Sequence, residues 1–81
     1  VEKAMKFNQA VFKTFDRLCE MPLIGTERKF ENPKLSGTRF WFVKGFEKFI
    51  IFYKVFSNYV EIIRVLHSAQ DTDSILEEES I

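Results

Sequence analysis

The residues best suited to acid–base chemistry lie near position 67. His67 is the only histidine of the chain, and Asp71 follows it four residues later. An imidazole titrates near neutral pH, and a carboxylate that orients it can make it a general acid or base. A histidine at the end of a strand more often forms a hydrogen bond with the following loop. Spacing therefore leaves both interpretations open and favours the loop contact.

Basic and aromatic residues form a second group of candidates. Lysines and arginines in or beside apolar segments can bind phosphate, and Trp41 or Tyr53 can stack on a base. The basic residues of this group are Arg39, Lys44, Lys48, Lys54 and Arg64. The same residue types also build an ordinary core with a charged, solubilising rim. Spacing alone does not separate these two interpretations.

Metal and nucleotide chemistry are disfavoured by the composition. One cysteine and one histidine cannot supply a site rich in these ligands, and the three glycines are isolated rather than grouped in a phosphate-binding loop. We therefore expect no metal and no cofactor. Cys19 is expected to fill the apolar side of a helix as a reduced thiol.

The first element that positions these residues is an amphipathic helix from Val1 to about Met21. Apolar residues recur at steps of three and four, with charged residues on the other side. The apolar positions are Ala4, Phe7, Val11, Phe15 and Leu18. Pro22 lacks an amide donor and disfavours helical backbone at Met21, so the helix should end there. No capping residue precedes the pattern, which suggests an N-terminally incomplete domain.

Three strands are expected after a surface loop at residues 22–38. Strand-forming residues fill 39–44, 48–56 and 59–67, and the connections at Gly45 and at Ser57–Asn58 are short. Short connections require antiparallel neighbours, which gives a meander. Strict alternation in the last strand puts Ile62, Arg64 and Leu66 on one face.

The predicted fold class is α+β, a single domain over residues 1–81. The N-terminal helix packs on one face of the three-stranded antiparallel meander, and the other face stays open as an aromatic surface with basic groups. Ser74 and Glu77 form a capping-box pattern that predicts a short C-terminal helix.

Size and charge favour a protein that binds partners. A chain of 81 residues buries only about 60% of its unfolded surface when it folds. Its 16% aromatic content supplies an unusually large set of apolar side chains that can form an interface. Residues 1–67 carry all 12 basic residues against seven acids, whereas residues 68–81 carry five acids and no base. No apolar run reaches the length of a membrane span, so we expect a cytoplasmic protein without a membrane partner.

Two consecutive apolar segments resemble a known family. They are Phe49–Val55, with Tyr53 and Lys54 near its end, and Val60–His67, followed by Asp71. Together with the helix that ends before Pro22 and with Arg39 at the start of the sheet, they resemble the RelE/ParE superfamily of bacterial toxins, and most of all its ParE, or plasmid-stabilisation, branch. Members normally begin with one more strand and helix.

The resemblance implies the toxin of a type II toxin–antitoxin system, neutralised by a cognate antitoxin. ParE-type members poison DNA gyrase, whereas RelE-type members cleave messenger RNA on the ribosome. RelE-like ribonucleases carry an arginine shortly before the strand tyrosine and a basic cluster after the last strand. Here Ile50 and the stretch 68–71 hold these places, which favours the gyrase poison over the enzyme.

Two alternatives remain beside the ParE-like gyrase inhibitor. One is a RelE-like, ribosome-dependent endoribonuclease, for which the candidate catalytic residues are Arg39, Tyr53, Arg64 and His67. The other is an inactive, truncated toxin that binds antitoxin or forms a homo-oligomer through an open sheet edge. For partner binding, the candidate residues are Arg39, Trp41, Lys54, Arg64, His67 and Asp71.

Overall fold

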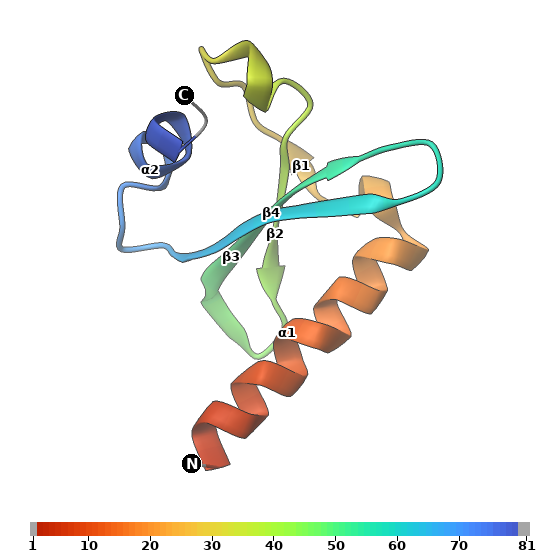
Figure 1. Ribbon diagram of the computed structural model, residues 1–81. Helices are drawn as coiled ribbons and strands as arrows, with labels where there is room; N and C mark the ends of the chain where they lie inside the picture. Colours follow the sequence, from red (N-terminus) through yellow and green to blue (C-terminus); the bar gives the residue numbers. More distant parts are fainter. Residues whose placement is uncertain (1, 80–81) are drawn as a thin grey trace.

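A computed structural model describes residues 2–79, with side chains from Ala4 onward, and has the expected α+β architecture (Figure 1). Helix α1 covers Glu2–Glu20. It buries Leu18 completely and packs Phe7, Val11 and Phe15 against the sheet. The Met21 amide donates the last helical hydrogen bond to the Arg17 carbonyl, 2.8 Å, before Pro22 ends the helix. The predicted first helix is confirmed.

Strands β2 (Arg39–Val43), β3 (Phe46–Val55) and β4 (Val60–His67) form the predicted antiparallel meander. Residues 22–38 hold more structure than the expected loop: two short 3₁₀ helices, η1 (Pro22–Ile24) and η2 (Pro33–Leu35), and strand β1 (Thr26–Glu27). Because β1 pairs with Arg39 and Phe40, the sheet has four strands in the order β1-β2-β3-β4. A strand of two residues gives too short a pattern to be recognised in the sequence.

The expected alternation in β4 is wrong because of a β-bulge. Phe52 lies opposite Arg64, but the next residue, Tyr53, lies opposite Ile62, so Ile63 is the extra residue of β4. Ile62 and Val65 therefore pack in the α1-side core, whereas Ile63 and Leu66 pack on the other side. Arg64, the cross-strand partner of Phe52, lies on the same side of the sheet as Phe52, which is the face opposite α1.

The second face of the sheet is covered, contrary to the open surface that we expected. Helix α2 (Thr72–Glu79) lies on the side of the sheet opposite α1 (Figure 1) and buries Leu76 against Phe52 and Leu66. Leu35 from η2 completes this buried cluster. The chain thus encloses the centre of its own sheet between two layers.

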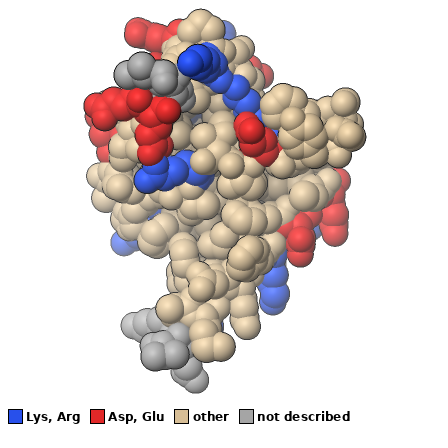
Figure 2. Space-filling view, in the orientation of Figure 1, with Lys and Arg blue, Asp and Glu red and all other residues tan. Residues whose placement is uncertain are grey.

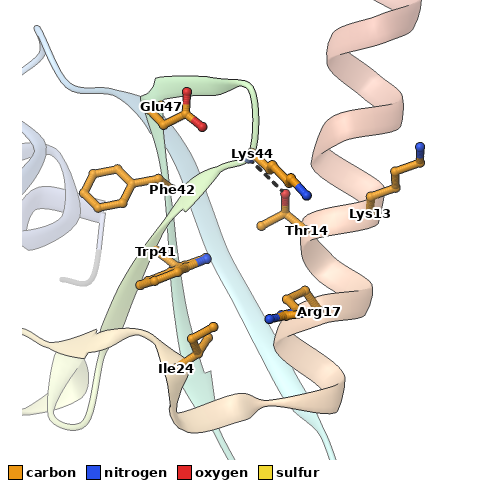
Figure 3. Close-up of a pocket in the computed structure, with 8 residues that line it drawn as sticks. All are labelled: Lys13, Thr14, Arg17, Ile24, Trp41, Phe42, Lys44 and Glu47. Atoms are coloured by element: carbon orange, nitrogen blue, oxygen red, sulfur yellow. Dashed lines mark hydrogen bonds between the residues drawn. The ribbon is translucent and has the colours of Figure 1, made fainter.

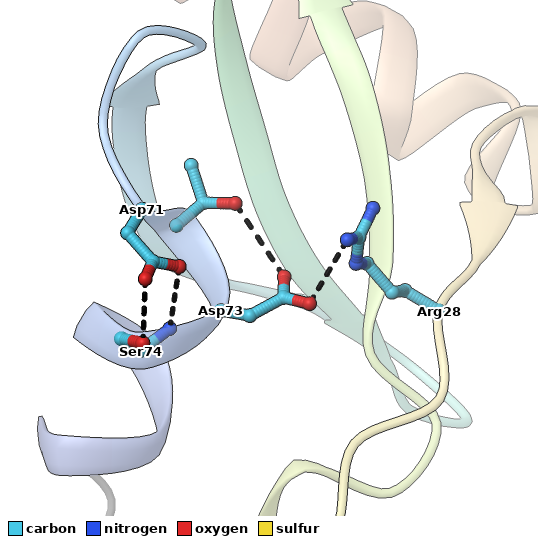
Figure 4. Close-up of polar contacts among 5 residues, drawn as sticks. Arg28, Asp71, Asp73 and Ser74 are labelled. Carbon is cyan, nitrogen blue, oxygen red and sulfur yellow. Dashed lines mark hydrogen bonds and ion pairs between the residues drawn. The ribbon is translucent and has the colours of Figure 1, made fainter.

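Asp71, rather than Ser74, begins α2. The Asp71 carboxylate accepts hydrogen bonds from the Ser74 amide at 3.3 Å and from the Ser74 hydroxyl at 2.8 Å (Figure 4). This is the geometry of an N-cap, which satisfies an amide left free at the start of a helix. The capping-box assignment to Ser74 and Glu77 is therefore wrong, although the short helix itself is confirmed.

Arg28 ties α2 to the segment after β1. Its guanidinium forms an ion pair with the Asp73 carboxylate at 2.9 Å, across 45 residues of sequence (Figure 4).

Two further expectations concern the exposure of Cys19 and the presence of membrane-spanning helices. Cys19 is exposed rather than buried, and among residues 2–79 no helix is both long and apolar enough to cross a membrane.

The buried position of Leu76 generates a prediction. Leu76→Ala should lower the free energy of unfolding by about 2–5 kcal/mol because it leaves a cavity between α2 and the sheet. Leu23→Ala, the same change at a side chain that is 67% exposed, should change it by less than about 0.5 kcal/mol. Urea unfolding followed by circular dichroism measures both; equal effects would contradict the packing of α2.

Candidate functional site

Tyr53 lies at the centre of the molecule and is fully buried. Its hydroxyl donates a hydrogen bond to the Pro22 carbonyl at 2.7 Å and accepts one from the Gly25 amide at 2.9 Å. Burial raises the pKa of this hydroxyl above its ordinary value, against smaller lowering effects of the Gly25 amide and the Arg39 charge. The phenol is therefore held neutral and bound on both sides, which does not suit a general base.

Gly25 permits this close contact. A Cβ atom at position 25 would lie 2.4 Å from the Tyr53 hydroxyl and 2.7 Å from the Phe40 carbonyl oxygen. The backbone of Gly25 is ordinary extended chain, with φ of −73°, so the requirement for glycine here is one of space. The turn after α1 is thereby held directly against β2 and β3.

Arg39 is brought next to Tyr53, its cross-strand partner. One guanidinium nitrogen, Nη1, donates a hydrogen bond to the Gly25 carbonyl at 2.7 Å. Two of the candidate catalytic residues are thus neighbours, but both contact the same turn. Their observed contacts hold the end of α1 on the sheet.

His67 does not contact Asp71 through its ring. Its Nδ1 atom accepts a hydrogen bond from the Ala69 amide at 3.0 Å, and the ring packs edge-on against Phe49, with centroids 4.9 Å apart. The Asp71 carboxylate is occupied by Ser74. This is the arrangement of a strand-end histidine that orders the following loop.

Arg64 and Lys54, on the face opposite α1, are also engaged within the chain. Arg64 forms an ion pair with Glu79 of α2, and the Lys54 ammonium donates a hydrogen bond to the Lys34 carbonyl. Both side chains therefore contact the helices that cover this face, Arg64 at α2 and Lys54 at η2. The six candidate partner-binding residues do not form one patch, since Trp41 belongs to the α1 side of the sheet.

Exposed apolar side chains gather on α1, on the turn after it and on the β3–β4 hairpin. They are Met5, Phe12, Met21, Leu23, Phe56 and Tyr59. The rings of Phe56 and Tyr59 stack at 4.7 Å, at the tip of the hairpin. Figure 2 shows a largely uncharged surface in the lower half of the view, over α1, with charged groups at its margin. A surface of this kind is typical of a protein interface.

A groove of about 530 Å³ lies between α1 and β2 (Figure 3). Its basic residues are Lys13 and Arg17 of α1 and Lys44 of the β2–β3 turn, while Ile24 and Trp41 supply apolar surface. From the sequence, Lys13 and Arg17 were expected only to lie among the charged residues on the polar side of the first helix. Their four-residue spacing puts them on one side of the helix, but nothing in the sequence shows that β2 lies beside it.

No group of three or more His, Cys, Asp or Glu side chains suited to a metal ion occurs among residues 4–79. Three acids of α2, Asp73, Glu77 and Glu79, instead make separate contacts with Arg28, Asn32 and Arg64. The apolar surface over α1 and the basic groove beside it remain as candidate sites for a partner.

The chain is similar to one known protein family. Residues 1–72 match the family model described as the ParE toxin of type II toxin-antitoxin system, parDE. No curated protein and no solved structure matches the chain significantly. The matched region contains α1, the whole sheet and the residues of the basic groove.

The Tyr53 contacts generate a prediction about stability and pH. Tyr53→Phe should lower the free energy of unfolding by about 1–3 kcal/mol because the Pro22 carbonyl and the Gly25 amide lose their buried partner. Since the fold raises the Tyr53 pKa, an unfolded tyrosine ionises first, and the stability that Tyr53 adds should be lost as the pH rises above about 10.

Denaturant unfolding at neutral and alkaline pH measures both effects, with Tyr59→Phe as the matched control because Tyr59 is exposed. The alkaline loss of stability should be smaller in Tyr53→Phe than in the wild type and unchanged in Tyr59→Phe. An alkaline loss that is the same in all three proteins would show that Tyr53 is not the responsible group.

Proposed function

Because the chain belongs to the ParE toxin family of type II toxin–antitoxin systems, we propose that it acts by binding and inhibiting DNA gyrase and that a cognate antitoxin neutralises it. Membership of this family implies an antitoxin partner. Gyrase is the target that the resemblance to the ParE branch implies. The proposal makes the chain a toxin that works by protein binding in the cytoplasm, without a cofactor.

One observation carries the choice of binding over catalysis. The four side chains that a ribonuclease reaction would require are Arg39, Tyr53, Arg64 and His67, and each contacts another part of the same chain. A general acid or base must reach the proton that it moves. Tyr53 cannot do so without breaking the contact that holds the turn after α1. Ile50, at the place of the RelE arginine, can neither bind phosphate nor transfer a proton.

The apolar surface over α1 supports a protein partner. Phe12 is 65% exposed, and of the residues one turn away on the same helix only Phe15 is half-buried. Its ring contacts only Phe15 among the described aromatic rings, with centroids 5.9 Å apart. Aromatic residues, phenylalanine included, are enriched at protein interfaces relative to the rest of the surface.

The experiment compares two activities of the purified chain. Inhibition of plasmid supercoiling by gyrase, with accumulation of cleaved DNA complexes, is the expected result, and transcripts in a translating extract should stay intact. Transcript cleavage without gyrase inhibition would instead support the RelE-like alternative. Inactivity in both assays, with antitoxin binding retained, would support the inactive remnant and contradict the proposal.

A pair of variants tests the surface. Phe12→Ala should raise the concentration needed for half-inhibition of gyrase at least about tenfold, as expected for a central aromatic contact. Phe42→Ala removes another exposed phenylalanine, which lies on β2 and outside the apolar surface over α1, and should leave inhibition nearly unchanged. Both proteins must first show wild-type circular dichroism. Equal inhibition by Phe12→Ala and the wild type would exclude Phe12 from the contact.

A further inference from the structure

The hydrogen bonds of the connection between β4 and α2 fall into two groups. Gln70 binds back to the last residue of β4: its amide donates to the His67 carbonyl at 3.0 Å, and its side-chain oxygen Oε1 accepts from the His67 amide at 2.9 Å. Asp71 instead bonds into α2, through its cap on Ser74. The helix can therefore rotate about the chain between residues 70 and 71 and keep both its own cap and the end of β4.

Helix α2 does not hold its position through its own stability. It has eight residues, and isolated helices shorter than about 12–15 residues are marginal in water. The three glutamates at its C-terminal end oppose the helix dipole. Among its described residues Leu76 alone is buried. The position of α2 therefore depends on its contacts with the sheet.

The face beneath α2 presents a row of two rings between two guanidinium groups. Phe40 of β2, Phe52 of β3 and Arg64 of β4 are successive cross-strand neighbours. The Arg28 guanidinium lies over the Phe40 ring, 6.0 Å from its centroid. Neighbouring strands lie about 4.8 Å apart, so the outer two of these three strands are separated by about 10 Å.

The side chains of α2 have the matching order and spacing. Asp73 pairs with Arg28 at one end of the row (Figure 4), and Glu79 pairs with Arg64 at the other. Six residues of helix separate the two acids, a rise of about 9 Å. Leu76, midway between them, packs in the apolar cluster under the helix. The helix thus lies on the row through an acid, an apolar side chain and a second acid.

Both ion pairs remain accessible to solvent. The side chains of Arg28 and Asp73 are 43% and 44% exposed, and those of Arg64 and Glu79 are 43% and 47% exposed. Pairs of this kind contribute little individually and are screened by salt. Two of the contacts that hold α2 are therefore sensitive to ionic strength, whereas the strand pairing of the sheet is not.

We propose that α2 is a hinged cover that detaches from the sheet as one unit while the rest of the fold stays intact, and that ionic strength controls its opening. Opening breaks both ion pairs and exposes the row of rings and guanidinium groups. Segments with few buried contacts open locally in this way. The family match ends at residue 72, where α2 begins, so the cover lies beyond the matched region. The inference does not depend on gyrase being the target.

Thiol labelling measures the opening. Leu66 is 3% exposed in the cluster with Leu76, and Val43 is fully buried on the α1 side. Leu66→Cys and Val43→Cys are each made in a Cys19→Ser chain, because the natural thiol is exposed. Iodoacetamide should label the Leu66→Cys protein at least about tenfold faster than the Val43→Cys protein. Raising the salt from about 50 mM to about 500 mM should accelerate only the former, by about two- to fivefold.

Charge variants test whether the ion pairs control the cover. Glu79→Gln in the Leu66→Cys protein should speed labelling about two- to fivefold at low salt, as expected for the loss of one half-exposed ion pair. Glu78→Gln is the matched control. It removes the same charge from an exposed acid of α2 that makes no ion pair among the described residues, and it should leave the labelling rate unchanged.

Hydrogen exchange of the unmodified chain gives a second readout, which needs no substitution in the core. The amides of α2 should exchange at least about a hundredfold faster than those at the centre of β3, and salt should accelerate only α2. Equal labelling of the two cysteine variants, one common exchange rate for α2 and β3, or the absence of a salt effect would each overturn the proposal. Equal acceleration by Glu78→Gln and Glu79→Gln would also overturn it.

Discussion

The structure depends on the hydroxyl of Tyr53, which joins the turn after α1 to the centre of the sheet. Tyr53 is fully buried, and its two hydrogen bonds satisfy Pro22 and Gly25 at the point where the chain leaves the helix. Arg39 binds the same turn from the neighbouring strand. If the turn moved, α1 would lose its position on the sheet, and both the apolar surface and the basic groove would lose a wall. A buried, fully satisfied polar network of this kind specifies one arrangement of the elements.

The second constraint is the cover that α2 provides. Leu76 fills the space over Phe52 and Leu66, and Asp71, Arg28 and Arg64 fix the helix at its two ends. The acids near the C-terminus thus neutralise particular basic residues of the body. The chain thus uses two of its basic residues, Arg28 and Arg64, to hold α2. Lys13, Arg17 and Lys44 beside α1 have no such ion pair among the described residues.

The sequence predicted α1 and the three long strands because their patterns extend over many residues, whereas the short helix α2 was predicted from a capping pattern. It could not predict β1, whose two residues carry no pattern, or the bulge at Ile63, which depends on how β3 and β4 pair. Exposure of Cys19 was missed because helical spacing does not show where the edge of the sheet lies. The family resemblance drew attention to Tyr53 and Arg39, but only the three-dimensional contacts show that they hold a turn. The groove brings together residues 13, 17, 24, 41 and 44, and their spacing in the sequence does not predict that they lie close together.

The central claim is that the chain acts as a binding surface and that its titratable candidates have structural roles. The most direct measurement is growth arrest by the His67→Gln protein, compared with the wild type at equal levels of folded protein. His67 is the residue best suited to proton transfer near neutral pH, and a general acid or base contributes about 10²–10⁴-fold to a rate. The account predicts growth arrest close to that of the wild type. Loss of growth arrest in a folded His67→Gln protein would contradict it.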